Sequence, residues 1–204
     1  MWGAALVAGF GAVAATSRAI AGLLRSAAWG VPEFSGVDVK VCGSADLQEA
    51  PGSHLTVSLY LHHVAPNASR GSQGPRVDAT GRRRRPGIAL ELHYLLTAWS
   101  KHPETQQRLF GWCLQTLHAT PTLPGPFLNH HASEPVFRPD ETVELVWENM
   151  AQSSVLDIWD VARRNVQPSA TYVARVIEIE SAEELQEGGL VQTRDLRFAS
   201  TGSR

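Results

Sequence analysis

Histidine is the residue type in this sequence that most suggests chemistry. There are eight histidines, including the adjacent pairs His62-His63 and His130-His131, which could supply metal ligands. Adjacent residues of a strand point to opposite faces, so His62 and His63 are not expected to reach one ion. His130-His131 lies in a proline-rich segment, and the chain has no i,i+4 histidine pair or HExxH motif. The histidine pattern therefore predicts no metal site.

The other residue types that perform catalysis are present without a recognisable arrangement. The two cysteines, Cys42 and Cys113, lie in no nucleophile signature, and Cys113 is expected to be a small buried hydrophobe. No GxSxG, P-loop or dinucleotide-binding motif occurs. Glu91 and Glu144 could face each other across a sheet, but exposed carboxylates of this kind are common. We therefore expect a protein that is not an enzyme and that uses no cofactor.

A run of four arginines is the strongest charge feature of the chain. Arg82 to Arg85 is reinforced by Arg70 and Arg76. This cluster could bind phosphates, although no aromatic residue is interleaved to stack on bases, and we expect no nucleic acid partner. It could also be a solvated loop tip, or it could pair with acidic stretches of another copy, such as Asp140-Glu141 or Glu183-Glu184. The predicted partner-contact residues are Arg76, Arg82, Arg83, Arg84 and Arg85.

Composition places these residues in a soluble globular domain. The chain has 204 residues, 43% hydrophobic and 19% charged, and a formal net charge of −2. Its first 17 residues are uncharged, and the first basic residue, Arg18, follows the apolar run instead of preceding it. A secretion signal has the opposite order, and the run is too short and too rich in glycine to span a bilayer. We expect an N-terminal helix within residues 1–30 and no stable membrane insertion.

Hydrophobic periodicity predicts the elements that must position these residues. A single α+β domain is expected over residues 1–180, with a mostly antiparallel or mixed sheet flanked by an N-terminal and a central helix. A long Arg-rich loop over residues 66–87 should join two paired strands. Residues 181–204 form a C-terminal tail with one weak strand near residues 190–198. The four tryptophans expected mainly in the core are Trp99, Trp112, Trp147 and Trp159. The expected helices cover residues 4–28, 104–118 and 154–162, and the expected strands cover 37–41, 55–61, 88–96, 141–147 and 171–179.

An ordered string of motifs resembles a known family. The strand LTVSLYLHHVAPN is followed by a polar loop, by RPGIALELHYLLTAWS and by the helix ETQQRLFGWCLQTLHATPTL. This order resembles the cap, or tail-terminator, family of extracellular contractile injection systems of the antifeeding-prophage and virulence-cassette type. The family pattern P.L.L.L.YLLTAW corresponds to residues 86–99, its LLG motif to 109–111, its LW helix to 158–159 and its Y.V.V strand to 172–176. The likeness spans residues 37–180.

The resemblance implies a structural role. Members of this family form a six-membered ring on the distal end of the inner tube and sheath, and the ring ends polymerisation. The implied partners are copies of the chain itself and the tube and sheath subunits, assembled in the cytoplasm as part of a phage-tail-like particle. The Arg-rich loop and the residues after Ser181 match no family feature. The alternative function is an adaptor that grips an acidic or phosphate-bearing partner through Arg82 to Arg85.

Overall fold

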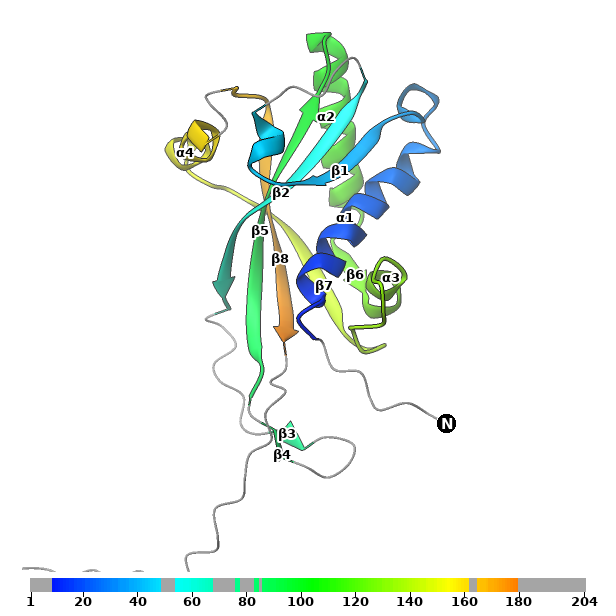
Figure 1. The fold of residues 1–204 in the computed structure, drawn as a ribbon. Helices are drawn as coiled ribbons and strands as arrows, with labels where there is room; N and C mark the ends of the chain where they lie inside the picture. The colour runs from blue at the N-terminus through cyan, green and yellow to red at the C-terminus, as the bar shows by residue number, and fades with distance from the viewer. Residues whose placement is uncertain are drawn as a thin grey trace, which may run out of the picture.

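Alternating apolar residues build one six-stranded sheet at the centre of the molecule (Figure 1). The computed structural model describes residues 9–48, 54–67, 76–77, 83–84, 86–161 and 165–179. The strand over residues 38–42 pairs in parallel with the strand over residues 56–66. All other neighbouring strands of this sheet pair antiparallel. In spatial order the strands are β1 (Asp38–Cys42), β2 (Thr56–Pro66), β5 (Ile88–Trp99), β8 (Ser169–Ile179), β7 (Thr142–Glu148) and β6 (Thr122–Pro124).

Three helices cover one face of this sheet (Figure 1). They are α1 (Ala12–Ala28), α2 (Pro103–Ala119) and α3 (Gly125–His130), and their apolar sides share one buried cluster with the sheet. The inner side of α1 is mainly alanine, which lets the helix axis approach the strands closely. Ser17 Oγ and Tyr94 OH lie 2.8 Å apart and join α1 to β5. The small side chains of α1 that are wholly buried are Ala12, Ala15, Ala19 and Ala21.

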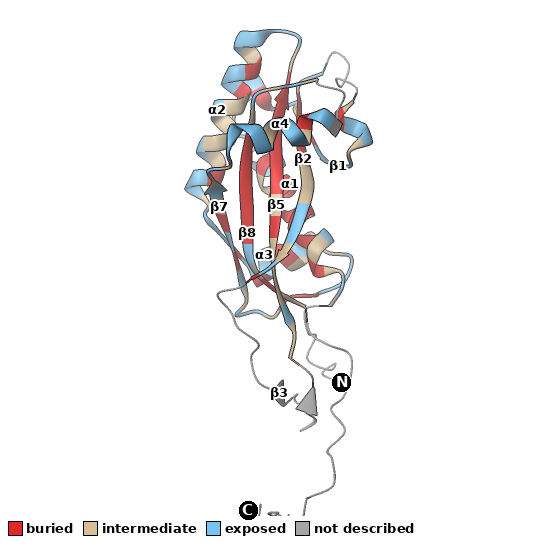
Figure 2. Cartoon of the chain, turned by 90° about the vertical axis from the view of Figure 1, so that its left-hand side faces the viewer, coloured by how far each residue is buried: buried red, intermediate tan, exposed pale blue. Residues whose placement is uncertain are grey.

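A second, smaller cluster covers only part of the opposite face (Figure 2). It is built by α4 (Gln152–Val161) and by the short 3-10 helix η2 (Ala45–Leu47) over one end of β5. Trp99 and Trp159 meet there with ring centroids 6.0 Å apart, and Trp99 Nε1 donates to Ser58 Oγ. The other end of this face carries histidines and charged residues on β2, β5, β7 and β8.

The tryptophan prediction is correct for the buried residues Trp99 and Trp159 and wrong for Trp147. Trp112 is partly buried against the core. Trp147 stacks on Tyr172 with a centroid distance of 6.4 Å, but 61% of its surface stays exposed. One face of its ring is therefore packed and the rest remains available for contact.

Two β-bulges break the alternation that the sequence suggests. On β2, Leu61 pairs with Tyr94 and His63 with His93, so His62 is an extra residue. On β8 the register shifts in the same way beside residue 176. This shift places Ile177 in the same buried cluster as Tyr172, although strict alternation would put the two side chains on opposite faces.

The expected fold class is confirmed: the domain is α+β with a mixed sheet and with the N-terminal and central helices on it. The paired strands around the Arg-rich segment are β2 and β5, as expected. That segment was expected to be a loop, but it contains a two-stranded sheet of β3 (Arg76–Val77) and β4 (Arg83–Arg84). Sequence periodicity also missed β6 and α3. Within the described ranges, no helix is both long and apolar enough to cross a membrane. The tail 181–204, with its predicted strand, lies outside the described residues.

Candidate functional site

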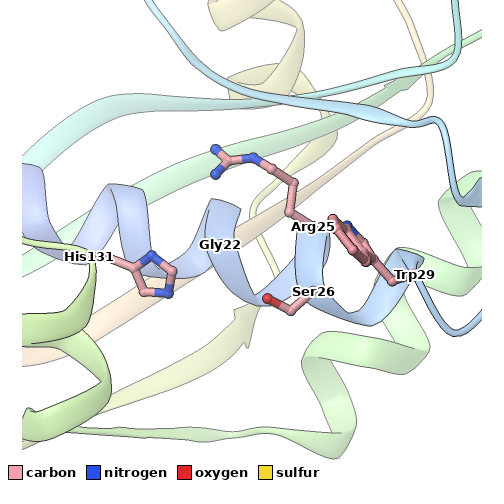
Figure 3. Close-up of a pocket in the computed structure, with 5 residues that line it drawn as sticks. All are labelled: Gly22, Arg25, Ser26, Trp29 and His131. Atoms are coloured by element: carbon pink, nitrogen blue, oxygen red, sulfur yellow. The ribbon is translucent and has the colours of Figure 1, made fainter.

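A hollow lies beside the C-terminal half of α1, where the helix passes the end of α3 (Figure 3). Its volume is about 480 Å³. The local sequence explains the space, because Gly22 and Ser26 on this side of α1 present little or no side chain. The residues that line it are Gly22, Arg25, Ser26, Trp29 and His131.

His131 closes one end of the hollow. Its ring lies against Gly22 so closely that a Cβ atom at position 22 would collide with the imidazole. Phe127 packs edge-on against the ring with centroids 4.9 Å apart, and Arg18 Nε donates to the His131 carbonyl over 2.8 Å. Burial lowers the pKa of His131, and the nearby His130 and Arg25 lower it further. The ring is therefore held neutral near pH 7 and offers a polar, uncharged wall.

Arg25 and Trp29 form the open side of the hollow. Arg25 reaches from α1 to the outermost strand, where its Nε and Nη2 donate to the Val39 carbonyl over 3.3 and 3.2 Å. Trp29 caps the C-terminus of α1, and 83% of its surface is exposed. Large aromatic and arginine side chains are the residues that most often anchor protein interfaces. The hollow thus has the composition of a site for another protein segment.

The histidines of β2 form a second cluster, because a bulge overturns the expectation that His62 and His63 point to opposite faces. Because His62 is the bulged residue, His62 and His63 both approach His93, with ring centroids 6.2 and 5.2 Å from it. His93 Nδ1 lies 3.1 Å from Glu148 Oε2. Burial lowers the pKa of His62. The nearby His93 and His63 lower this pKa further, and Glu148 opposes the shift. Among the described residues, no group of histidine, cysteine, aspartate and glutamate is arranged to hold a metal ion.

Glu91 and Glu144, which the sequence allowed to face each other, instead flank one arginine. Both are in register with Arg175 of β8, and Arg175 Nε lies 3.5 Å from Glu91 Oε1. Burial raises the pKa of Cys42 to about 11 and that of Cys113 to about 12. Both thiols are therefore protonated near neutral pH, in the state that disfavours nucleophilic attack.

The strands that carry Arg76, Arg83 and Arg84 contribute no residue to the lining of the hollow. The backbones of Arg76 and Arg84 pair across β3 and β4, and Arg83 pairs with Val77. Arg82 and Arg85 lie outside the described residues. The role of these five arginines remains a prediction.

Sequence reasoning missed the hollow altogether. Arg25 was visible only as a polar position of the helix, and Trp29 only as a residue near the helix end. The available signals were a glycine inside an amphipathic helix and a tryptophan placed just before the Gly30-Val31-Pro32 turn. Neither signal reveals that α3 and the edge strand lie beside them.

Comparison with known proteins gives the family. A family described as "Pvc16 N-terminal domain" matches residues 15–193. The chain belongs to this family. Membership confirms the resemblance seen in the motif string, over most of the same residues. Among curated proteins, no sequence matches.

Two solved structures share the family fold. One is the sheath/tube terminator of the extracellular contractile injection system PVC in its extended state, with a TM-score of 0.59 and 15% identity. The match covers 94% of this chain and 64% of that one. The other is the tube-terminating cap of the anti-feeding prophage, with a TM-score of 0.52 and 14% identity, covering 85% of this chain and 60% of that one. The chain therefore spans less than two thirds of either structure.

Proposed function

We propose that this chain is a structural, noncatalytic part of a cap that ends the inner tube and sheath of a contractile injection system. The observation that carries the proposal is family membership over residues 15–193. The fold supports it, because both similar structures are terminators of such particles. The protonated thiols of Cys42 and Cys113 and the pairing of Glu91 with Arg175 are consistent with a role that requires binding surfaces instead of chemistry.

We infer that the cap is a ring of copies, six in number as the family resemblance implies, assembled in the cytoplasm. A ring closes through contacts in which each subunit presents two different, complementary surfaces. This domain has unlike surfaces on its two sides: an aromatic hollow beside α1 and a histidine- and glutamate-bearing sheet face beside β2. The proposed partners beyond the ring are tube and sheath subunits. Arg76 and Arg82 to Arg85 remain candidates for contacts with acidic groups of these partners.

Electron microscopy of particles tests the function directly. Particles are assembled with sheath and tube subunits in the presence or absence of this protein, and their lengths are measured. We expect a narrow length distribution with the protein and a broad one without it, because polymerisation then lacks a stop. Unchanged lengths in its absence would contradict the proposal. A folded variant that fails to bind particle ends, added at the same concentration, controls for unspecific effects of added protein.

A further inference from the structure

One edge of the central sheet is open to a further strand. Asp38 N donates to the Leu55 carbonyl over 3.0 Å, so the backbone groups of Asp38 face β2. In a parallel pair, alternate residues of a strand direct both backbone groups to the same neighbour. Lys40 and Cys42 therefore also face β2, while Val39 and Val41 direct their N–H and C=O groups away from the sheet. Val41 is also 44% exposed, and no strand lies beyond β1 among the described residues.

The opposite edge of the sheet is closed to such pairing. Its strand, β6, has only three residues, with Pro121 before it and Pro124 at its end. Proline has no N–H to donate, and short proline-bearing strands are a common way to protect a sheet edge. The two edges thus differ in their capacity to accept a strand.

The open edge and the hollow share one residue. Arg25 lines the hollow and also holds the outward carbonyl of Val39. Trp29 lies one helical turn further along α1, beside the same space (Figure 3). A strand added along β1 would therefore run past the hollow and could place a side chain against Trp29. Backbone pairing along an edge, with side-chain pockets for selectivity, is an established mode of peptide recognition.

We propose that β1 receives residues 190–198 of a neighbouring copy of this chain. The inference rests on the proposed ring. Residues 190–198 have strand-like character, with Leu190, Leu196 and Phe198 on one side if the segment is extended. Residues 180–189, which follow the end of β8, can span about 30 Å when extended, enough to leave the domain that carries them.

Charge in the chain leading to this segment favours the same occupant. Residues 180–187 include four glutamates, while residues 190–198 carry Asp195 together with Arg194 and Arg197. The side of α1 that borders the hollow exposes Arg18 and Arg25 instead. When an incoming N–H takes the Val39 carbonyl, the Arg25 guanidinium is released and can pair with a carboxylate of the arriving segment. Exchange of this segment from copy to copy gives each subunit the two unlike patches that a ring needs.

The test uses two proline variants of the full chain. Val41→Pro removes an outward N–H and leaves the bonds from β1 to β2 intact, so it blocks the edge. Leu196→Pro disables the segment of the same chain that would be donated. Val41→Thr and Leu196→Val are the matched controls, because both keep the N–H groups. Circular dichroism and thermal unfolding verify that each variant is folded, and light scattering coupled to gel filtration gives the mass.

We expect the wild type and both controls to form a closed oligomer and each proline variant alone to have the mass of one chain. An equimolar mixture of the two proline variants should form a species of two chains and no larger, because one variant retains an edge and the other a donor segment. Proline variants that keep the wild-type mass, or a mixture that gives no pair, would overturn the inference. A monomeric wild type that still limits particle length overturns it as well but leaves the proposed function intact. The wild type could also form an oligomer that each proline variant abolishes and still fail to limit particle length. That result overturns only the proposed function.

Discussion

The contact between Ser17 and Tyr94 fixes α1 on the sheet and so sets the position of Arg25 and Trp29. Ser17 Oγ lies 2.8 Å from Tyr94 OH and 3.1 Å from the Val13 carbonyl. A serine hydroxyl has one proton, and the carbonyl can only accept it. Tyr94 must therefore donate to Ser17, and Tyr94 has no exposed surface through which water could replace that acceptor. The two partners should respond differently to removal.

Ser17→Ala leaves the buried Tyr94 hydroxyl without an acceptor, which costs about 1–3 kcal/mol. Alanine recovers about 0.5 kcal/mol of this through its better helix propensity. Tyr94→Phe removes both the donor and its need for a partner, while Ser17 keeps its bond to Val13, so the expected cost is about 0.5–1.5 kcal/mol. In the Tyr94→Phe background, Ser17→Ala leaves no orphaned group and should cost close to nothing. The coupling energy between the two sites is therefore expected to be about 1–2 kcal/mol.

Urea unfolding of the wild type, both single variants and the double variant measures this cycle. Helix propensity enters both arms of the cycle equally and cancels in the coupling energy. The reasoning is refuted if Ser17→Ala destabilises the Tyr94→Phe chain as much as it destabilises the wild type. In that case the hydroxyl pair would not be the contact that holds α1 in place.

Three further predictions concern pH, charge and thiol reactivity. The pKa of His62 is lowered in the folded chain. The free energy of unfolding should therefore keep its full value above pH 6.5, the ordinary histidine pKa, and fall as the pH drops below it. Urea unfolding between about pH 7.5 and 5.5 should show this loss, and His62→Gln should reduce it. Replacing Arg82–Arg85 by serine should weaken capture of an acidic partner, and the loss should be larger at about 50 mM than at about 200 mM salt. Pull-down with sheath–tube particles checks this, and unchanged capture would rule out the adaptor function. Burial that raises the pKa of Cys113 to about 12 should slow its alkylation at pH 8 more than about 1,000-fold relative to a free cysteine. Mass spectrometry after iodoacetamide treatment measures this rate, and reaction of Cys113 at the rate of a free thiol would contradict its burial.

The long, regular elements were predictable from sequence because one face of each is buried. The alternation in residues 55–61 and 88–96 gave β2 and β5, and the spacing of Leu109, Cys113 and Leu117 gave α2. α3 and β6 were missed because each is short and lies among prolines, where periodicity has too few residues to register. β6 is instead held by pairing with β7, and α3 by the Asn129 side chain, which bonds the backbone N–H and carbonyl of Phe137.

The candidate site was less predictable than the fold because it depends on register and edges. An extra residue at position 62 shifts one histidine without changing the apolar pattern, so the pairing of His63 with His93 is visible only in the structure. The role of Arg25 likewise depends on β1 being an outer strand whose Val39 carbonyl points away from the sheet. Sequence reasoning found the strand itself but not its place in the sheet. The Arg-rich segment is conspicuous in sequence, but its described strands β3 and β4 do not line the hollow that the fold creates.

Energetic considerations explain why an open edge would need the hollow beside it. Ordering about five residues of an incoming strand costs on the order of 5–10 kcal/mol of backbone entropy. The outward groups of Val39 and Val41 can form at most four bonds with it, each contributing about 1 kcal/mol net, and one of them replaces the existing Arg25 contact. Backbone pairing alone is therefore insufficient, which keeps the isolated edge from joining arbitrary strands. Burying an apolar side chain against Trp29 adds about 1.5–3 kcal/mol, and a released Arg25 can add a charged contact. A segment that supplies both an apolar anchor and a carboxylate can thus bind where a generic strand cannot, and this selectivity is what a subunit needs if it is to join copies of itself and nothing else.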